Sequence, residues 1–480
     1  MTVLYIVLAL IVAFLGVILI RAAIFRPRTE KEDEPETVDF DRDAAVSTLQ
    51  ELIHCRTVSF YDPAMEDDTE FERFIGLLPE LYPEVARECI LTRLPNRALL
   101  FKWNGTEHNA PSVLMSHYDV VPVDADKWTK PAFDALIDEN GVLWGRGCLD
   151  TKLTFNGIMY AANHLITRGY KPSQDIYFAF SGGEEVNGPG AVHIVDWFEN
   201  HGITPALVVD EGGAVVENVF PGVQRPCALI GIAEKGMMNI ELSVSSSGGH
   251  ASSPKPHSPI GILSRACCRL ENHPFKMHIT ESAAEMFDTL GRHSSFMYRI
   301  IFANLWCFGG ILDTMSKKKG GELNALLRTT VAFTQASGSQ APNIIPPTAS
   351  FVANLRLNPR DSVDSALGYV KSIAGDENVH FTVGAGAINP SAISEIRCSA
   401  WGKVAEAVAD TWPGCIVSPY LMVQCSDSRH YGRISNHVYR FSAADLTAEE
   451  RSSIHGNDEH VRVEVVKRAV EFYIRLMGKC

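Results

Sequence analysis

The chain has 480 residues, 46% of them hydrophobic and 21% charged, which is enough for two domains with separate cores. Its formal net charge of −14 argues against a nucleic-acid partner, which would require a basic surface. Eleven cysteines without a C-x-x-C pair do not form the pattern of a disulfide framework.

The N-terminal segment is apolar. Residues 1–20 carry no charged side chain, and about 20 such residues span a bilayer. The basic residues from Arg21 to Lys31 follow this segment, and no small-residue cleavage site comes after it, so the pattern favours an uncleaved transmembrane anchor (1–24) over a secretory signal. The positive-inside rule then places the rest of the chain on the cytoplasmic side. Residues 25–40, which include the acidic stretch Glu30 to Asp39, are expected to form a solvated linker.

Helices and strands alternate after the linker. Helical periodicity predicts helices over 41–54, with Asp41 as N-cap, and over 67–78. Further elements are expected as a strand before His117, a helix at 154–168, a strand at 176–180, a helix at 190–201, a strand at 206–209 and a C-terminal helix at 463–477. This alternation predicts an α/β domain with a mostly parallel sheet, built from residues 41–235 and 391–480.

The pattern between these two segments is different. Residues 236–390 are expected to form an inserted ferredoxin-like domain. Its predicted β-α-β-β-α-β elements are a strand at 239–245, a helix at 259–270, strands at 329–336 and 349–357, a helix at 361–374 and a strand at 379–383. Residues 274–323 are surplus to this pattern, and we interpret them as a helical insertion.

Five residues with metal-ligand chemistry are spread along the catalytic segments: His117, Asp150, Glu185, Asp210 and His455. Three apolar runs lead directly into His117, Glu185 and Asp210, and ligand sites in open α/β sheets form beyond the carboxyl ends of strands. Because such a set of like charges needs a compensating cation, the sequence predicts a metal site of the binuclear kind.

Mixed oxygen and imidazole ligands suit Zn²⁺, with Co²⁺ or Mn²⁺ as alternatives. Asp119 lies two residues after His117, so an extended backbone directs both side chains to one side, where Asp119 could bind the second imidazole nitrogen. Glu184 and Glu185 are adjacent, and one ligand plus one free general base is the economical assignment.

Several motifs resemble those of the zinc-dependent aminoacylase/carboxypeptidase family, in particular carboxypeptidase S and its N-acyl-amino-acid hydrolase relatives. The motifs are Ser116 to Pro122, Trp144 to Lys152, Ser181 to Glu185, Asp210 to Gly213, Gly248 to Pro254 and Ile454 to Glu459. The resemblance covers nearly everything from about residue 40 to the C-terminus.

The resemblance implies a role for each metal-site residue. Asp150 would bridge two zinc ions, His117 and Asp210 would complete one ion, and Glu185 and His455 would complete the other. Glu184 would be the general base, and Asp119 would orient His117.

The resemblance also gives roles to the inserted domain. His250 would stabilise the oxyanion in the active site of a partner subunit, which implies a homodimer formed through a lid domain. Asn343 and Arg356 would hold the carboxylate of a small peptide or N-acyl amino acid substrate. The chain departs from the family pattern at Gln424-Cys425-Ser426, where relatives carry Gly-Gly-Thr, so the shape of the substrate pocket is left open.

The expected function is therefore hydrolysis of the amide bond next to a free carboxylate by a membrane-anchored dinuclear zinc enzyme. Two alternatives stay open. A metal-dependent aminopeptidase would use the same metal chemistry without a carboxylate clamp. An inactive membrane-anchored binding protein would have lost a ligand or Glu184, and none of these is missing.

Overall fold

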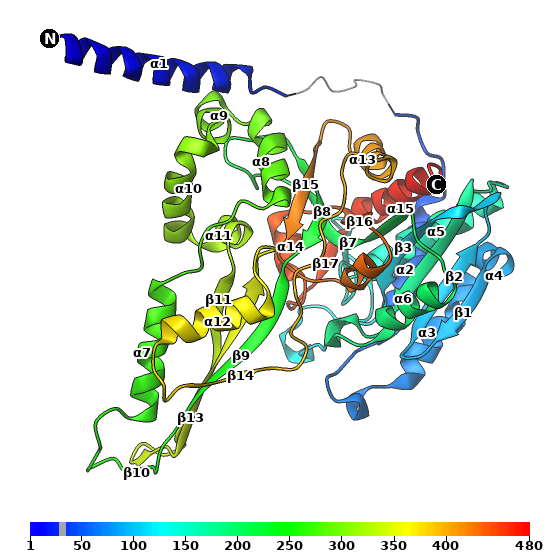
Figure 1. Ribbon diagram of the computed structural model, residues 1–480. Helices are drawn as coiled ribbons and strands as arrows, with labels where there is room; N and C mark the ends of the chain where they lie inside the picture. Colours follow the sequence, from blue (N-terminus) through cyan, green and yellow to red (C-terminus); the bar gives the residue numbers. More distant parts are fainter. Residues whose placement is uncertain (28–34) are drawn as a thin grey trace.

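A computed structural model describes residues 1–27 and 35–480, so part of the predicted linker (25–40) lies outside the described residues. Figure 1 shows the apolar helix α1 (Thr2–Ile24), an α/β body and a second, elongated sheet that extends away from this body. By length and composition α1 is able to cross a membrane, as both an anchor and a signal sequence would be.

The body is organised around an eight-stranded sheet with the order β1-β2-β6-β3-β7-β16-β8-β15. Its strands are β1 (Ile90–Leu94), β2 (Ala98–Trp103), β3 (Glu107–His117), β6 (Gln174–Ser181), β7 (Leu207–Val216), β8 (Cys227–Glu234), β15 (Ile416–Met422) and β16 (Val438–Asp445). Neighbours β6–β3, β3–β7, β7–β16 and β8–β15 are parallel, whereas β1–β2, β2–β6, β16–β8 and β7–β8 are antiparallel. The sheet is thus mixed. Its central strands β6, β3, β7 and β16 are parallel, in agreement with the expected mostly parallel sheet, whereas β1, β2 and the β16–β8 neighbours are antiparallel.

Short reversals of the chain explain this mixture. Asn96 and Arg97, between β1 and β2, both have a positive φ of 57°, the left-handed geometry that turns one strand back beside the last. Residues 217–226 likewise reverse the chain between β7 and β8. Neither reversal leaves room for the crossover helix that parallel neighbours require.

Helices cover both faces of this sheet. One face carries α2 (Arg42–Ile53), α5 (Lys152–Thr167), α13 (Ser399–Thr411) and α15 (Val463–Met477), and the other carries α6 (Gly190–Asn200). Further helices of the body are α3 (Asp68–Leu81), α4 (Pro83–Glu88) and α14 (Ala448–Ser453). Asp41 caps α2 as expected, since its side chain accepts the amide N–H of Ala44 at 2.9 Å.

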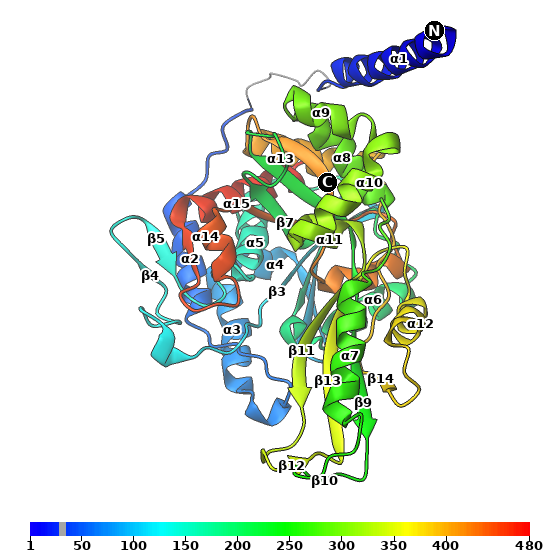
Figure 2. The same cartoon turned by 90° about the vertical axis from the view of Figure 1, so that its left-hand side faces the viewer.

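The second sheet has the expected β-α-β-β-α-β topology, with the antiparallel order β11-β13-β9-β14 (Figure 2). Its elements are β9 (Gly236–Ser245), α7 (Pro259–Asn272), β11 (Thr330–Ser337), β13 (Thr348–Leu357), α12 (Val363–Ala374) and β14 (His380–Val383). A short pair, β10 (Gly249–His250) and β12 (Ile344–Ile345), closes its far tip. The roles of this sheet as a lid and as a dimer surface stay predictions.

The surplus segment is helical, as expected, but its helices pack mainly on the body, and only its start, at Phe275, lies in the core of the second sheet. It forms α8 (Glu281–His293), α9 (Phe296–Phe302), α10 (Leu305–Lys319) and α11 (Gly321–Leu327). Apolar side chains of α8, such as Met286 and Phe287, share a core with Tyr420 and Leu421 of β15. These helices therefore extend the body at the β15 edge of its sheet and also contact α1, although they belong in sequence to the predicted inserted domain (236–390).

Candidate metal centre

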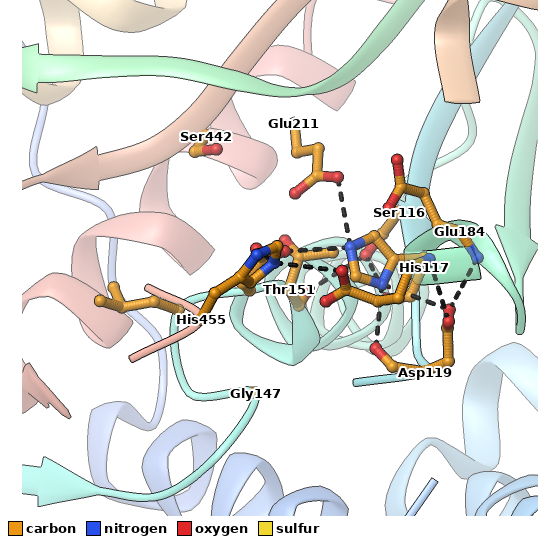
Figure 3. A network of polar contacts seen from close by, with 12 residues as sticks. Ser116, His117, Asp119, Gly147, Thr151, Glu184, Glu211, Ser442 and His455 are labelled. Carbon is orange, nitrogen blue, oxygen red and sulfur yellow. Dashed lines mark hydrogen bonds and ion pairs between the residues drawn. The ribbon is translucent and has the colours of Figure 1, made fainter. Parts of the chain in front are cut away.

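The side chains of the candidate site come from strand ends and from the loops that follow them (Figure 3). His117 is the last residue of β3, and Glu184 and Glu185 form a short turn directly after β6. Asp150 lies between β5 (Val142–Trp144) and α5. In a small sheet completed by β4 (Leu136–Ile137), β5 pairs with β17 (His460–Arg462), which brings the preceding loop with His455 to the same place.

Asp150 lies between the two imidazoles and divides its oxygens between them. Its Oδ1 is 3.0 Å from Nε2 of His117, and its Oδ2 is 2.9 Å from Nε2 of His455. The Nε2 atom of each imidazole also has a second carboxylate near it. Oε1 of Glu211 lies 3.3 Å from Nε2 of His117, and Oε2 of Glu185 lies 3.1 Å from Nε2 of His455. The result is two adjoining groups of one imidazole and two carboxylates that share Asp150.

Asp210 is expected in this cluster from the sequence, whereas the structure brings its neighbour Glu211 to His117 (Figure 3). The carboxylate of Asp210 is directed to another loop, where it accepts the amide N–H of Ser428 at 2.9 Å. The sequence held a weak signal for this difference: adjacent acidic residues of a strand point to opposite faces, so only one of the two can reach the cluster.

Asp119 contacts both His117 and the Glu184–Glu185 turn. The N–H at Nδ1 of His117 donates to the carbonyl oxygen of Asp119 at 3.0 Å, and Oδ1 of Asp119 lies 3.4 Å from the same nitrogen. This contact leaves Nε2 as the free ligand atom of His117. The carboxylate of Asp119 also accepts the amide N–H groups of Glu184 (3.1 Å) and Glu185 (3.2 Å) and the hydroxyl of Ser59 (2.7 Å). Asp119 thus orients the imidazole mainly through its carbonyl oxygen and the Glu184–Glu185 turn through its carboxylate.

Glu459 fixes the loop that carries Asp150. This fully buried carboxylate accepts a hydrogen bond from the Arg146 guanidinium (2.7 Å) and the amide N–H groups of Gly147 (3.2 Å), Leu149 (2.8 Å) and Asp150 (3.1 Å). Sequence analysis included Glu459 in a motif without giving it a role. Its four donors come from one loop, so the position of Asp150 depends on this residue.

Burial and crowding shift the charges of the cluster. Burial raises the pKa of Glu184 well above its usual range and that of Glu211 to about 8, and neighbouring carboxylates act in the same direction. Hydrogen bonds to Asp150 and Glu185 raise the pKa of His455 to about 11. Burial disfavours the charge of Asp150, but hydrogen bonds from both imidazoles hold its pKa well below the usual value. The crowded carboxylates and both imidazoles therefore favour bound protons, and divalent cations would supply the same positive charge in their place.

The donor atoms of the cluster suit divalent metal ions. In each of the two groups the ligand atoms all lie within 4.8 Å of one another. Imidazole nitrogen and carboxylate oxygen are ligands of Zn²⁺ and related ions. Oε1 of Glu185 is buried without a hydrogen-bond partner, a costly state that an ion at this position would relieve. The residues present therefore fit a pair of metal ions.

The three residues assigned to the lid do not lie together. Arg356 on β13 extends to the loop of the body that contains Cys425, and its Nη1 lies 3.5 Å from Sγ of that residue. His250 lies on β10 at the far tip of the second sheet, where its exposed ring contacts the hydroxyl of Ser252 at 2.7 Å. Asn343 is exposed beside it, and its carbonyl oxygen accepts the amide N–H of Ala251. Within one chain, only Arg356 is near the metal-binding body.

The fold and this donor set define the class of the protein as a metal-dependent α/β hydrolase. The model of Peptidase family M20/M25/M40 matches residues 113–479, and the chain belongs to this family. It is therefore an enzyme, a hydrolase that acts on amide bonds.

Relatives and solved structures cover almost the whole chain. The N-fatty-acyl-amino acid synthase/hydrolase PM20D1 of Xenopus tropicalis is 33% identical over 478 residues, which is 97% of this chain and 93% of that protein. The probable carboxypeptidase S-like 2 of Dictyostelium discoideum is 32% identical over 465 residues, 94% of this chain and 89% of that protein. The M20 family metallo-carboxypeptidase Sso-CP2 from Sulfolobus solfataricus shares the fold, with a TM-score of 0.67 at 16% identity, over 90% of this chain and 98% of that one.

Proposed function

We propose that this enzyme is a dinuclear zinc amidohydrolase that cleaves the amide bond next to a free carboxylate in dipeptides or N-acyl amino acids. The observation that carries the proposal is the position of Asp150, whose two oxygens serve two imidazoles, each with a further carboxylate. The names of the relatives, a carboxypeptidase S-like protein and an N-fatty-acyl-amino acid hydrolase, support a substrate with an acyl group on an amino acid.

The two metal positions share one ligand. His117, Asp150 and Glu211 would hold one ion, and Asp150, Glu185 and His455 would hold the other, with Zn²⁺ as the proposed metal and Co²⁺ or Mn²⁺ as alternatives. When bound, such a pair supplies Lewis acidity and lowers the pKa of a water molecule in the site.

Glu184 is the proposed general base. It adjoins the ligand Glu185 on the same turn and is not itself part of either ligand group. The backbone N–H bond from Glu184 to Asp119 fixes the turn, so the carboxylate is held ready to take the proton of the attacking water. Glu184 then donates this proton to the amide nitrogen. The C–N bond breaks and the amine leaves, which completes the hydrolysis.

The substrate carboxylate is the proposed ligand of Arg356, whose guanidinium fork suits such a group and which lies beside Cys425 of the body. His250 and Asn343 lie at the opposite end of the same sheet, so they would serve the site of a partner subunit in a homodimer formed through residues 236–390. There, His250 would donate a hydrogen bond to the developing oxyanion, and Asn343 would assist in binding the substrate.

The N-terminal helix α1 is the proposed uncleaved membrane anchor. Its apolar surface up to Ile20 and the basic residues behind it support a single span with the catalytic body on the cytoplasmic side. We propose that residues 41–235 and 391–480 form the catalytic domain, with α8–α11 packed against it.

Two substitutions test the metal and base assignments. Glu184→Gln should retain both metal ions and lose about three orders of magnitude in turnover, within the range of lost general acid–base catalysis. Asp150→Ala should lose both ions, because Asp150 alone adjoins both groups. Metal content per chain and hydrolysis of a panel of N-acyl amino acids and dipeptides are the measurements, with the exposed Glu80→Gln as the matched control. Near-normal turnover by Glu184→Gln would refute the mechanism.

A further inference from the structure

Helices α9 and α10 expose large apolar side chains to solvent. We name this surface, formed by Phe296, Met297, Tyr298, Trp306, Ile311 and Met315, the apolar shelf. Met297 is 71% exposed, Trp306 61% and Ile311 52%. Several large apolar side chains exposed on consecutive helices are unusual for a surface that faces only water, and such patches mark sites of interaction.

The apolar shelf lies against the C-terminal half of α1. The ring of Phe14 packs edge-on to that of Trp306, with centroids 5.9 Å apart. The guanidinium of Arg21 donates to the carbonyl oxygen of Ala303 and to Oδ1 of Asn304, and the side-chain amide of Asn304 donates to the carbonyl oxygen of Ile18. These polar groups thus form hydrogen bonds with one another, as polar groups in the apolar interior of a bilayer must do.

The extent of the apolar run in α1 determines how deep this junction would lie in a membrane. This run continues past Phe14 to Ile20, and Arg21 is the charged residue that follows it. A bilayer has a hydrocarbon core of about 30 Å, which takes about 20 helical residues. If α1 spans this core, its segment from Phe14 to Ile20 lies inside it, and Trp306 lies at the same depth.

The direction of α10 fits this position. Figures 1 and 2 both show α10 running crosswise to α1, whose N-terminus projects away from the body. A helix crosswise to a membrane-spanning helix lies roughly in the membrane plane, as interfacial helices do. The exposed Lys317, Lys318 and Lys319 at the end of α10 would then lie close to the lipid headgroups, where basic side chains bind anionic lipids.

We propose that α9 and α10 insert the apolar shelf into the interfacial layer of the membrane beside α1. The enzyme is then held by one spanning helix and one embedded surface, which fixes the orientation of the catalytic body relative to the bilayer. This inference rests on the proposed role of α1 as an uncleaved anchor.

Lipid photocrosslinking of the full-length chain tests the proposal. A benzoylphenylalanine residue is introduced singly in place of Met297 or Ile311 in the apolar shelf, Ile6 in α1, or Ile90, which is 57% exposed on β1 at the opposite side of the body. Each variant is reconstituted into vesicles of phosphatidylcholine and phosphatidylserine, illuminated and analysed for lipid adducts by mass spectrometry. Unchanged hydrolytic activity confirms that each variant is folded.

Lipid adducts at positions 297, 311 and 6, with at least tenfold fewer at position 90, are the expected result. Adducts at position 6 without adducts at 297 and 311 would refute the apolar shelf and leave the anchor intact. Adducts at none of these positions would refute the anchor as well. Crosslinks from 297 or 311 to a second protein chain instead of lipid would assign the surface to an interface between two copies of the enzyme.

Discussion

Glu211 and Asp210 allow a sharp test of the metal centre, because the two adjacent carboxylates have different roles in the structure. Glu211→Gln replaces a carboxylate that lies 3.3 Å from His117 and is 16% exposed. Asp210→Asn changes a carboxylate that accepts the Ser428 amide and contacts neither imidazole. Both substitutions keep the shape of the side chain and remove one charge, so each is the control for the other.

The expected magnitudes differ. Loss of a residue that only supports a ligand lowers metal affinity 10- to 100-fold, so loss of the charged ligand Glu211 should cost at least about 100-fold, or about 2.8 kcal/mol. The amide oxygen of Asn at position 210 can still accept the Ser428 N–H. Burial raises the pKa of Asp210 and so disfavours its charge, which offsets the weaker hydrogen bond of a neutral amide, and the folding stability should change by no more than about 1 kcal/mol.

Metal content after dialysis against a weak chelator, together with thermal unfolding, measures both effects. Glu211→Gln should retain about one ion per chain, and Asp210→Asn should retain two with its Tm lowered by no more than a few degrees. Loss of metal from Asp210→Asn with full retention by Glu211→Gln would refute this assignment and restore Asp210 as the ligand.

Three further predictions concern other parts of the site. Arg356→Ala should raise KM about 10- to 100-fold for substrates with a free carboxylate, because a charge-assisted hydrogen bond is lost. The corresponding carboxamides should be unaffected, and an equal loss on both would contradict the carboxylate role. Equal amounts of inactive His250→Ala and Glu184→Gln subunits, once exchanged, should recover activity at about a quarter of all sites, since each mixed dimer holds one complete site. No recovery despite proven exchange would show that His250 does not serve the partner subunit. Glu459→Ala should destabilise the fold by about 3–5 kcal/mol, because it leaves the buried Arg146 without its partner, and it should also reduce metal content. An unchanged Tm and metal content would show that the Asp150 loop does not depend on it.

Local signals in the sequence predicted the elements well. The helix at 42–53 follows from its apolar spacing, and Asp41 caps it through a contact only three residues away. The four strands of the inserted sheet lie close to the predicted ranges, and their order with the helices α7 and α12 along the chain is the expected one. In the main sheet, β6 and β7 both run parallel to β3, as expected. The antiparallel strands β1 and β2 were not predicted, because they depend on a reversal at Asn96 and Arg97 where no glycine marks the left-handed backbone.

Local features of the sequence were sufficient to identify four of the candidate metal ligands, the adjacent pair Glu184–Glu185 and the apolar N-terminal segment. Which side chains contact one another depends on the folded chain. Glu211 reaches His117 because the loop at Ser428 takes the side chain of Asp210, and this loop lies more than 200 residues away in the chain. The insertion likewise packs on β15 and α1 because burial of its apolar faces there stabilises the fold, and such burial depends on surfaces that only the folded chain brings together.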